Sequence, residues 1–200
     1  MAAPTQDPNN TAYMIMDALV DGLRLKDEQL QQNAVLALTV IGRKALPFLE
    51  EKAKCKKTKP VHRERLLRVA QWLETFGSKP GNEGRTVVNY LIDALRVGNK
   101  SLNQKAADAL CGLSADVVDR LVPVAFLNWK KAGYCVRLLG VIERIGQISN
   151  AENHMNLIAL AGRGNERIHE AVRRAMMSAH PQKRDVLGGW DRLGRRDADG

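Results

Sequence analysis

Residues 30–38 read Leu30-Gln31-Gln32-Asn33-Ala34-Val35-Leu36-Ala37-Leu38, and their pattern returns 72 residues later as Leu102-Asn103-Gln104-Lys105-Ala106-Ala107-Asp108-Ala109-Leu110. Five of the nine positions are identical. At the same offset, Arg65-Leu66-Leu67-Arg68-Val69 recurs as Arg137-Leu138-Leu139-Gly140-Val141. A fixed period in helical sequence is typical of repeat arrays, in which each unit buries its apolar face against its neighbours. The repeat therefore predicts an all-α chain assembled from stacked helices.

The rest of the chain supports a helical fold. Apolar residues keep to a period near 3.6 and do not alternate as they would in strands. Of the 200 residues, 44% are hydrophobic but only 4% are aromatic, which favours helices packed through Ala, Leu and Val over a β-sandwich. We predict ten helices, at residues 11–25, 28–41, 43–56, 61–76, 84–97, 100–113, 115–131, 133–147, 150–162 and 166–179.

Polar residues, glycines and prolines mark the ends of these helices. The predicted N-caps are Asp27, Ser101, Ser114 and Asn165. The predicted C-terminal stops are Gly42, Gly77, Gly98 and Gly146. Pro60 suits the first turn of a helix, whereas Pro123 is expected to kink or split its helix.

A resemblance to a known family appears where two predicted helices meet. Residues 38–49, Leu-Thr-Val-Ile-Gly-Arg-Lys-Ala-Leu-Pro-Phe-Leu, resemble the alanine-rich helix, Ile-Gly turn and Ala-x-Pro-x-Leu restart of HEAT repeats, and residues 141–146 are similar. The resemblance implies a right-handed α-solenoid of about five antiparallel helix pairs, and it implies no particular ligand. The third and fourth pairs have Leu113-Ser114 in place of the Ile-Gly turn, and the divergent last pair is compatible with a polar-faced cap.

The repeats give the predicted domain organisation. Residues 1–10 are expected to form a disordered lead, residues 11–76 the first two helix pairs and residues 86–180 the other three. The Gly- and Pro-containing segment 77–85 is the predicted linker or hinge between them. Residues 181–200 are expected to form a flexible tail, although Leu187, Trp190 and Leu193 could dock as one apolar face.

Composition also restricts where the chain works. Cys55, Cys111 and Cys135 are odd in number and form no Cys-x-x-Cys pair, which predicts reduced thiols in the cytoplasm. The residues before the first predicted helix lack the basic and apolar regions of a signal peptide. The longest apolar stretch, residues 121–127, is too short to cross a bilayer, so no membrane association is expected.

Positive charge is concentrated in one segment. Between Arg43 and Arg68 there are ten basic and three acidic residues, which supply seven of the nine net positive charges. This segment is either a solvated turn or a footprint for phosphates. In a HEAT-like array the even-numbered helices line the concave face, so outward arginines would extend the segment into a basic ladder. The candidate binding residues are Lys52, Lys54, Lys56, Lys57, Lys59, Arg63, Arg65, Arg68, Arg137, Arg144, Arg173 and Arg174.

Catalytic and metal-binding motifs are not recognisable. The histidines His62, His154, His169 and His180 show neither the His-Glu-x-x-His spacing nor a zinc pattern with the cysteines. We therefore expect no catalytic residue, metal, cofactor or small-molecule substrate. DNA glycosylases and bilin lyase-like proteins built from HEAT-like repeats are enzymatic precedents. Trp72, Trp129 and Asp93 are the nearest residues to a glycosylase site, without a matching motif around them.

The sequence thus predicts a HEAT-like scaffold that binds another protein without catalysis. The alternative is a nucleic-acid-binding module with a basic concave surface, and a glycosylase-like or lyase-like enzyme ranks third. Pairing of the arginines with helix ends or with acidic residues of neighbouring repeats would argue against the basic ladder.

Overall fold

The computed structural model describes residues 8–77, 83–148 and 150–179, which fold into helices without strands. They divide after Gly112 into two compact units. Unit 1 contains α1 (Pro8–Arg24), α2 (Glu28–Ile41), the 3₁₀ turn η1 (Gly42–Ala45), α3 (Leu46–Lys54), α4 (Pro60–Phe76), α5 (Glu83–Ala94) and α6 (Lys100–Cys111). Unit 2 contains the 3₁₀ turn η2 (Ala115–Val117), α7 (Val118–Leu127), α8 (Ala132–Ile145), α9 (Ala151–Arg163) and α10 (Glu166–Ala179). Each predicted helix has a counterpart within a few residues.

The helix ends confirm most of the predicted caps. Asp27 caps α2, because its Oδ1 accepts a hydrogen bond of 2.9 Å from the Leu30 amide. At the equivalent position in α6 the cap is Asn99 and not Ser101, with a bond of 3.0 Å to the Leu102 amide. Gly98 ends no helix, since α5 stops at Ala94. The caps therefore belong to the 72-residue repeat, a relation that the choice of Ser101 missed.

One of the two prolines and the start of the first helix differ from expectation. Pro60 is the first residue of α4, as predicted. Pro123 lies inside α7, which continues through it to Leu127 and is not split. The first helix begins at Pro8, so residues 8–10 are helical and do not belong to a disordered lead.

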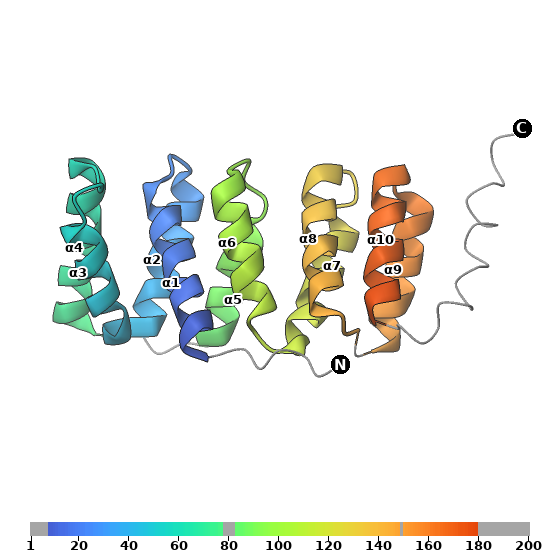
Figure 1. Cartoon of the computed structure of the whole chain (residues 1–200), viewed down its shortest axis with the longest axis horizontal. Helices are drawn as coiled ribbons and strands as arrows, with labels where there is room; N and C mark the ends of the chain where they lie inside the picture. Colours follow the sequence, from blue (N-terminus) through green and yellow to red (C-terminus); the bar gives the residue numbers. More distant parts are fainter. Residues whose placement is uncertain (1–7, 78–82, 149, 180–200) are drawn as a thin grey trace, which may run out of the picture. The chain divides into compact units, whose positions relative to one another are not determined.

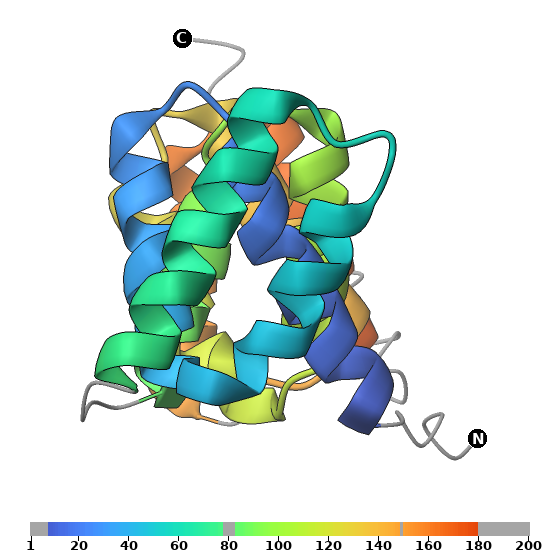
Figure 2. The same cartoon turned by 90° about the vertical axis from the view of Figure 1, so that its left-hand side faces the viewer.

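The three hairpins of unit 1 are not arranged in chain order (Figure 1). The hairpin α1–α2 lies in the middle, with α3–α4 on one side and α5–α6 on the other. The helix α1 packs against α6 and α2 packs against α5, while Tyr13 and Asp17 of α1 contact Phe48 and Lys52 of α3. Figure 2, which views α3 and α4 from outside, shows α4 and α2 toward the left and α3 and α1 toward the right. Unit 1 thus has two layers, α3–α1–α6 and α4–α2–α5.

The hairpins α1–α2 and α5–α6 are the two copies of the 72-residue repeat, and they pack on each other about a twofold axis. The match at an offset of 72 extends upstream, where Leu19-Val20-Asp21-Gly22-Leu23-Arg24 corresponds to Leu91-Ile92-Asp93-Ala94-Leu95-Arg96. Contacts between the two copies occur in reciprocal pairs. Lys105 of α6 pairs with Asp21 of α1, and the equivalent Asn33 of α2 donates to the equivalent Asp93 of α5 at 2.9 Å.

This arrangement corrects the expected groove. In a regular solenoid equivalent helices run parallel in one layer, but here α2 and its equivalent α6 lie in different layers. A face lined by α2, α4 and α6 is therefore not formed in unit 1. The predicted linker at 77–85 lies partly outside the described residues, and its role as a hinge stays a prediction.

Unit 2 consists of two hairpins whose equivalent helices run parallel. Asn150 and Asn153 at the start of α9 donate to Asp119 near the start of α7, at 2.8 and 2.7 Å. On the other side, Arg174 of α10 lies 3.1 Å from the Glu143 carboxylate of α8. Gly146, which ends α8 with φ of 67°, meets Ser178 at the position where a Cβ would lie, so this turn favours glycine.

The last described helix pair consists of α9 and α10, and the outer side of α9 is apolar. The side of α9 that faces away from α7 and α10 carries exposed Met155 and Ile158, so this helix does not have the polar outer face that a capping repeat would have. The proposed docking of Leu187, Trp190 and Leu193 lies outside the described residues. No helix within those residues combines the length and apolarity needed to cross a membrane.

Candidate binding surfaces

The predicted basic residues of unit 1 fall into three environments. One lies inside an ion-pair network, others bind a backbone carbonyl or a glutamate of their own helix, and the rest are free in solvent. Lys54 lies 3.4 Å from Glu50, and Arg68 lies 2.5 Å from Glu64, each pair within one exposed helix surface. Exposed pairs of this kind contribute little to stability and exchange partners readily. Lys54 and Arg68 therefore remain available to a ligand.

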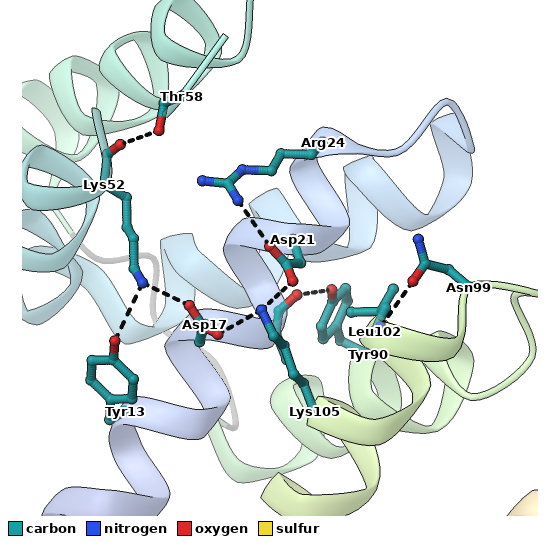
Figure 3. Close-up of polar contacts among 11 residues, drawn as sticks. Tyr13, Asp17, Asp21, Arg24, Lys52, Thr58, Tyr90, Asn99, Leu102 and Lys105 are labelled. Atoms are coloured by element: carbon teal, nitrogen blue, oxygen red, sulfur yellow. Dashed lines mark hydrogen bonds and ion pairs between the residues drawn. The ribbon is translucent and has the colours of Figure 1, made fainter. Parts of the chain in front are cut away.

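Lys52 is unavailable because it lies inside a network on the α3–α1–α6 layer (Figure 3). Its Nζ is 2.8 Å from Asp17 and donates to the Tyr13 hydroxyl at 3.3 Å, and it lies 4.9 Å from the ring centre of Phe48. The other oxygen of Asp17 is 2.7 Å from Lys105. Asp17 thus joins three helices, and Lys52 is a structural residue and no phosphate ligand.

Electrostatics strengthen this network. Burial alone raises the pKa of Asp17, but hydrogen bonds from Lys105 and Lys52 and their positive charges outweigh it and hold the pKa below its usual 3.8. Burial lowers the pKa of Lys52, and its bonds to Asp17 and Tyr13 more than compensate, so that the pKa is raised. Both partners are therefore fully charged at neutral pH.

Arg65 is also engaged within the fold. Its Nη1 donates to the backbone carbonyl of Leu23, near the end of α1. Beside it, burial and the charges of Arg24, Arg65 and Lys59 lower the pKa of His62, so this imidazole is neutral near pH 7. Arg65 thus satisfies a helix end, which is the pairing that argues against a basic ladder.

Three lysines in the loop between α3 and α4, together with one arginine in the first turn of α4, form what we call the basic loop patch. Lys56, Lys57, Lys59 and Arg63 are all exposed. Within the described ranges none of their side chains forms an ion pair or hydrogen bond. Among the predicted binding residues in the described part of unit 1, these four are unpaired and lie close together in the sequence.

The remaining predicted arginines belong to unit 2. Arg173 pairs with Glu170 at 2.8 Å, and Arg174 pairs with Glu143. Arg137 is half-buried and Arg144 is exposed on α8, and both have partners. The expected ladder across all repeats stays a prediction, and its members in unit 2 are paired.

A second surface, which we call the α4 stripe, combines apolar and basic side chains. It consists of Val61, Arg65, Arg68, Trp72 and Phe76, whose spacings of four, three, four and four place them along one side of α4. Val61 is 65% exposed and Phe76 68% exposed. The rings of Trp72 and Phe76 lie 5.4 Å apart, so that Phe76 stacks on its neighbour while facing solvent.

Sequence periodicity did not reveal this stripe. The core positions of α4, such as Leu66 and Leu73, satisfy the helical pattern by themselves. Val61 and Phe76 fit the same apolar period and so were not distinguished from the core positions. The available signal was the number of apolar residues in α4, which is larger than one buried side of the helix needs.

Within unit 1, the structure does not bring together Asp93 and Trp72, two of the residues considered for glycosylase chemistry. Asp93 lies in α5, where burial raises its pKa and the charge of Arg96 and a hydrogen bond from Asn33 oppose that rise. Trp72 lies in α4, in a hairpin on the far side of α1–α2. No cluster of three or more metal-ligating side chains occurs in the parts of the chain that the structure describes.

Comparisons with known proteins add no identification. No family model, no curated protein and no solved structure matches the chain.

Proposed function

We propose that this chain is a HEAT-like helical scaffold that binds another protein without catalysis, through the α4 stripe. The observation that carries the proposal is the pair of large apolar side chains, Val61 and Phe76, held in solvent on an end hairpin of unit 1. The parallel helix pairs α1 with α3, α7 with α9 and α8 with α10 support the repeat character.

The chemistry of the α4 stripe suits a protein partner. Trp and Arg are the residue types most enriched among binding hot spots, and aromatic anchors lose little entropy on binding. Val61 and Phe76 are 15 residues apart, which separates them by about 22 Å along the helix. A partner can therefore contact two apolar anchors with the guanidinium of Arg68 between them.

Charge indicates what kind of partner fits. Arg68 lies within the stripe, and Lys59 of the basic loop patch lies just before its first residue, whereas the exposed acids on α4 are Glu64 and Glu74. Complementary potentials speed association and select among partners. We therefore expect the partner to present apolar side chains flanked by carboxylates.

Proximity labelling with the full chain tests this function. Phe76→Glu should abolish labelling of the principal partner, because it places a carboxylate in the apolar contact. The matched control is Leu67→Glu, since Leu67 is 48% exposed on another side of the same helix. Circular dichroism should show the same helix content in both variants. Equal labelling by the two variants would contradict the α4 stripe as the binding surface.

Nucleic acid binding is the second candidate, and the free cations of the basic loop patch favour it. With four phosphate contacts, affinity for a duplex should fall roughly a hundredfold between about 50 and 200 mM salt. Fluorescence anisotropy with labelled duplex DNA and single-stranded RNA measures this slope. The double variant Lys56→Glu, Lys57→Glu should remove binding while Phe76→Glu retains it. An absence of binding at low salt would reject this candidate.

A further inference from the structure

The helix α9 of unit 2 has a solvent side without any charge. Residues 151, 155, 158, 159 and 162, which recur at helical spacing on the side away from α7 and α10, are Ala, Met, Ile, Ala and Gly. Met155 is 63% exposed and Ile158 is 40% exposed. Helices on a protein surface normally expose polar residues opposite their buried side. This apolar side, which we call the α9 face, therefore resembles half of a helix–helix contact.

The charges on α9 stand at its two ends. Glu152 lies one residue into the helix and is exposed, with no partner in the described part of the chain. Arg163 is the last residue of α9 and is also exposed, with its guanidinium 5.0 Å from the ring centre of Phe126. Stacking on a ring leaves the edge N–H groups of an arginine free to donate.

These two charges make α9 self-complementary. Glu152 and Arg163 are 11 residues apart, so they lie about three turns apart on the same flank of the α9 face. A twofold axis perpendicular to α9 preserves the flank and reverses the helix direction. It therefore brings Glu152 of one copy beside Arg163 of the other, twice in each dimer.

The apolar residues fit the same geometry. The axis passes between Leu157 and Ile158, which is midway between the two charges. Met155 of one copy then reaches the level of residue 160 in the other, between the small residues Ala159 and Gly162. A long flexible side chain opposite two small residues gives the interdigitation that close helix packing requires.

From this self-complementarity we infer that the chain forms a twofold dimer through antiparallel contact of two α9 faces. This association is independent of the α4 stripe and goes beyond the proposed scaffold function. A standard interface buries about 800 Å² on each partner, and a single helix face buries less than that, so we expect the dimer to be weak. The net charge of +9 on each copy opposes association at low salt.

Sedimentation equilibrium of the full chain tests the dimer over about 5 to 500 µM protein at about 150 mM salt, where charges are screened beyond roughly 8 Å. A reductant is needed because Cys55 is exposed and free. The mass should rise from monomer toward dimer with concentration. Met155→Glu should keep the chain monomeric throughout, whereas the matched control Leu67→Glu in unit 1 should dimerise normally.

Charge exchange separates the proposed geometry from general stickiness. Glu152→Arg alone should raise the dissociation constant by about tenfold, because it replaces two attractions with two repulsions. Adding Arg163→Glu should restore association, since the pair is then reversed but complementary. A chain that stays monomeric at every concentration would overturn the inference, whether its own C-terminal segment or another protein covers the α9 face. Dimers that ignore Met155→Glu, or that the exchange does not restore, would overturn it equally.

Discussion

Replacing Gly22 with alanine should destabilise unit 1 by about 3 kcal/mol. A Cβ at this position would lie 2.1 Å from the hydroxyl oxygen of Tyr90. Tyr90 is buried and donates a hydrogen bond of 2.6 Å to the carbonyl of Ala18, so it has no free space to enter. The substitution therefore costs overpacking, about 1–3 kcal/mol, and the weakening of a buried hydrogen bond.

Urea unfolding followed by circular dichroism measures this effect. The matched control is Gly140→Ala in α8, where a Cβ would meet nothing within 4 Å. That change should be neutral or stabilise by up to about 1 kcal/mol, because alanine favours helix more than glycine. In a Tyr90→Phe background, Gly22→Ala should cost less, since the closest clashing atom is gone. Equal costs in both backgrounds would show that Tyr90 is not the obstacle.

The local helices could be predicted because their signals are local. Asp27 and Asn99 stand three residues before Leu30 and Leu102, and both leucines begin a run of buried positions at helical spacing. A cap and an apolar period fix a helix whatever lies beside it. The same signals do not state which neighbour covers the apolar side.

The order of the hairpins could not be predicted for that reason. A 72-residue repeat is compatible with equivalent hairpins related by translation, as in a solenoid, or by a twofold axis. The deciding contacts, Tyr90 with Ala18 and Lys105 with Asp21, join residues 72 and 84 positions apart. Such pairs are visible only after the chain has folded, whereas the repeat itself is visible in the sequence.

The same limit applies to the predicted binding residues. Ten basic residues occur from Arg43 to Arg68, but the sequence does not show which group each of them pairs with. Lys52 finds its carboxylate 35 residues upstream, and Arg65 finds a carbonyl 42 residues upstream. The basic loop patch was within reach of prediction, because consecutive cations in a turn have no neighbouring helix to pair with.

Removing the Asp17 carboxylate should be the second most costly of these changes. Asp17→Ala leaves the ammonium groups of Lys52 and Lys105 facing each other without the anion between them. Their side chains are 20% and 32% exposed, so solvent screens part of the repulsion. We expect a loss of about 2 kcal/mol, between the value for an exposed pair and that for a buried one. Glu50→Ala, which breaks only the exposed pair with Lys54, should cost less than about 0.5 kcal/mol.

The pH dependence of unfolding identifies charge as the cause. Because the pKa of Asp17 is lower in the folded chain than its usual 3.8, the stability it contributes is present above the unfolded pKa and is lost as pH falls through the folded one. The difference in unfolding free energy between the parent chain and Asp17→Asn should thus be constant near neutral pH and shrink below about pH 4. A difference that persists unchanged in acid would mean that Asp17 acts by packing and hydrogen bonding alone.

A background without Lys52 tests the same cause. With Lys52→Met added, Asp17→Ala should cost less free energy of unfolding, because only the ammonium group of Lys105 then remains and Asp21 still pairs with it.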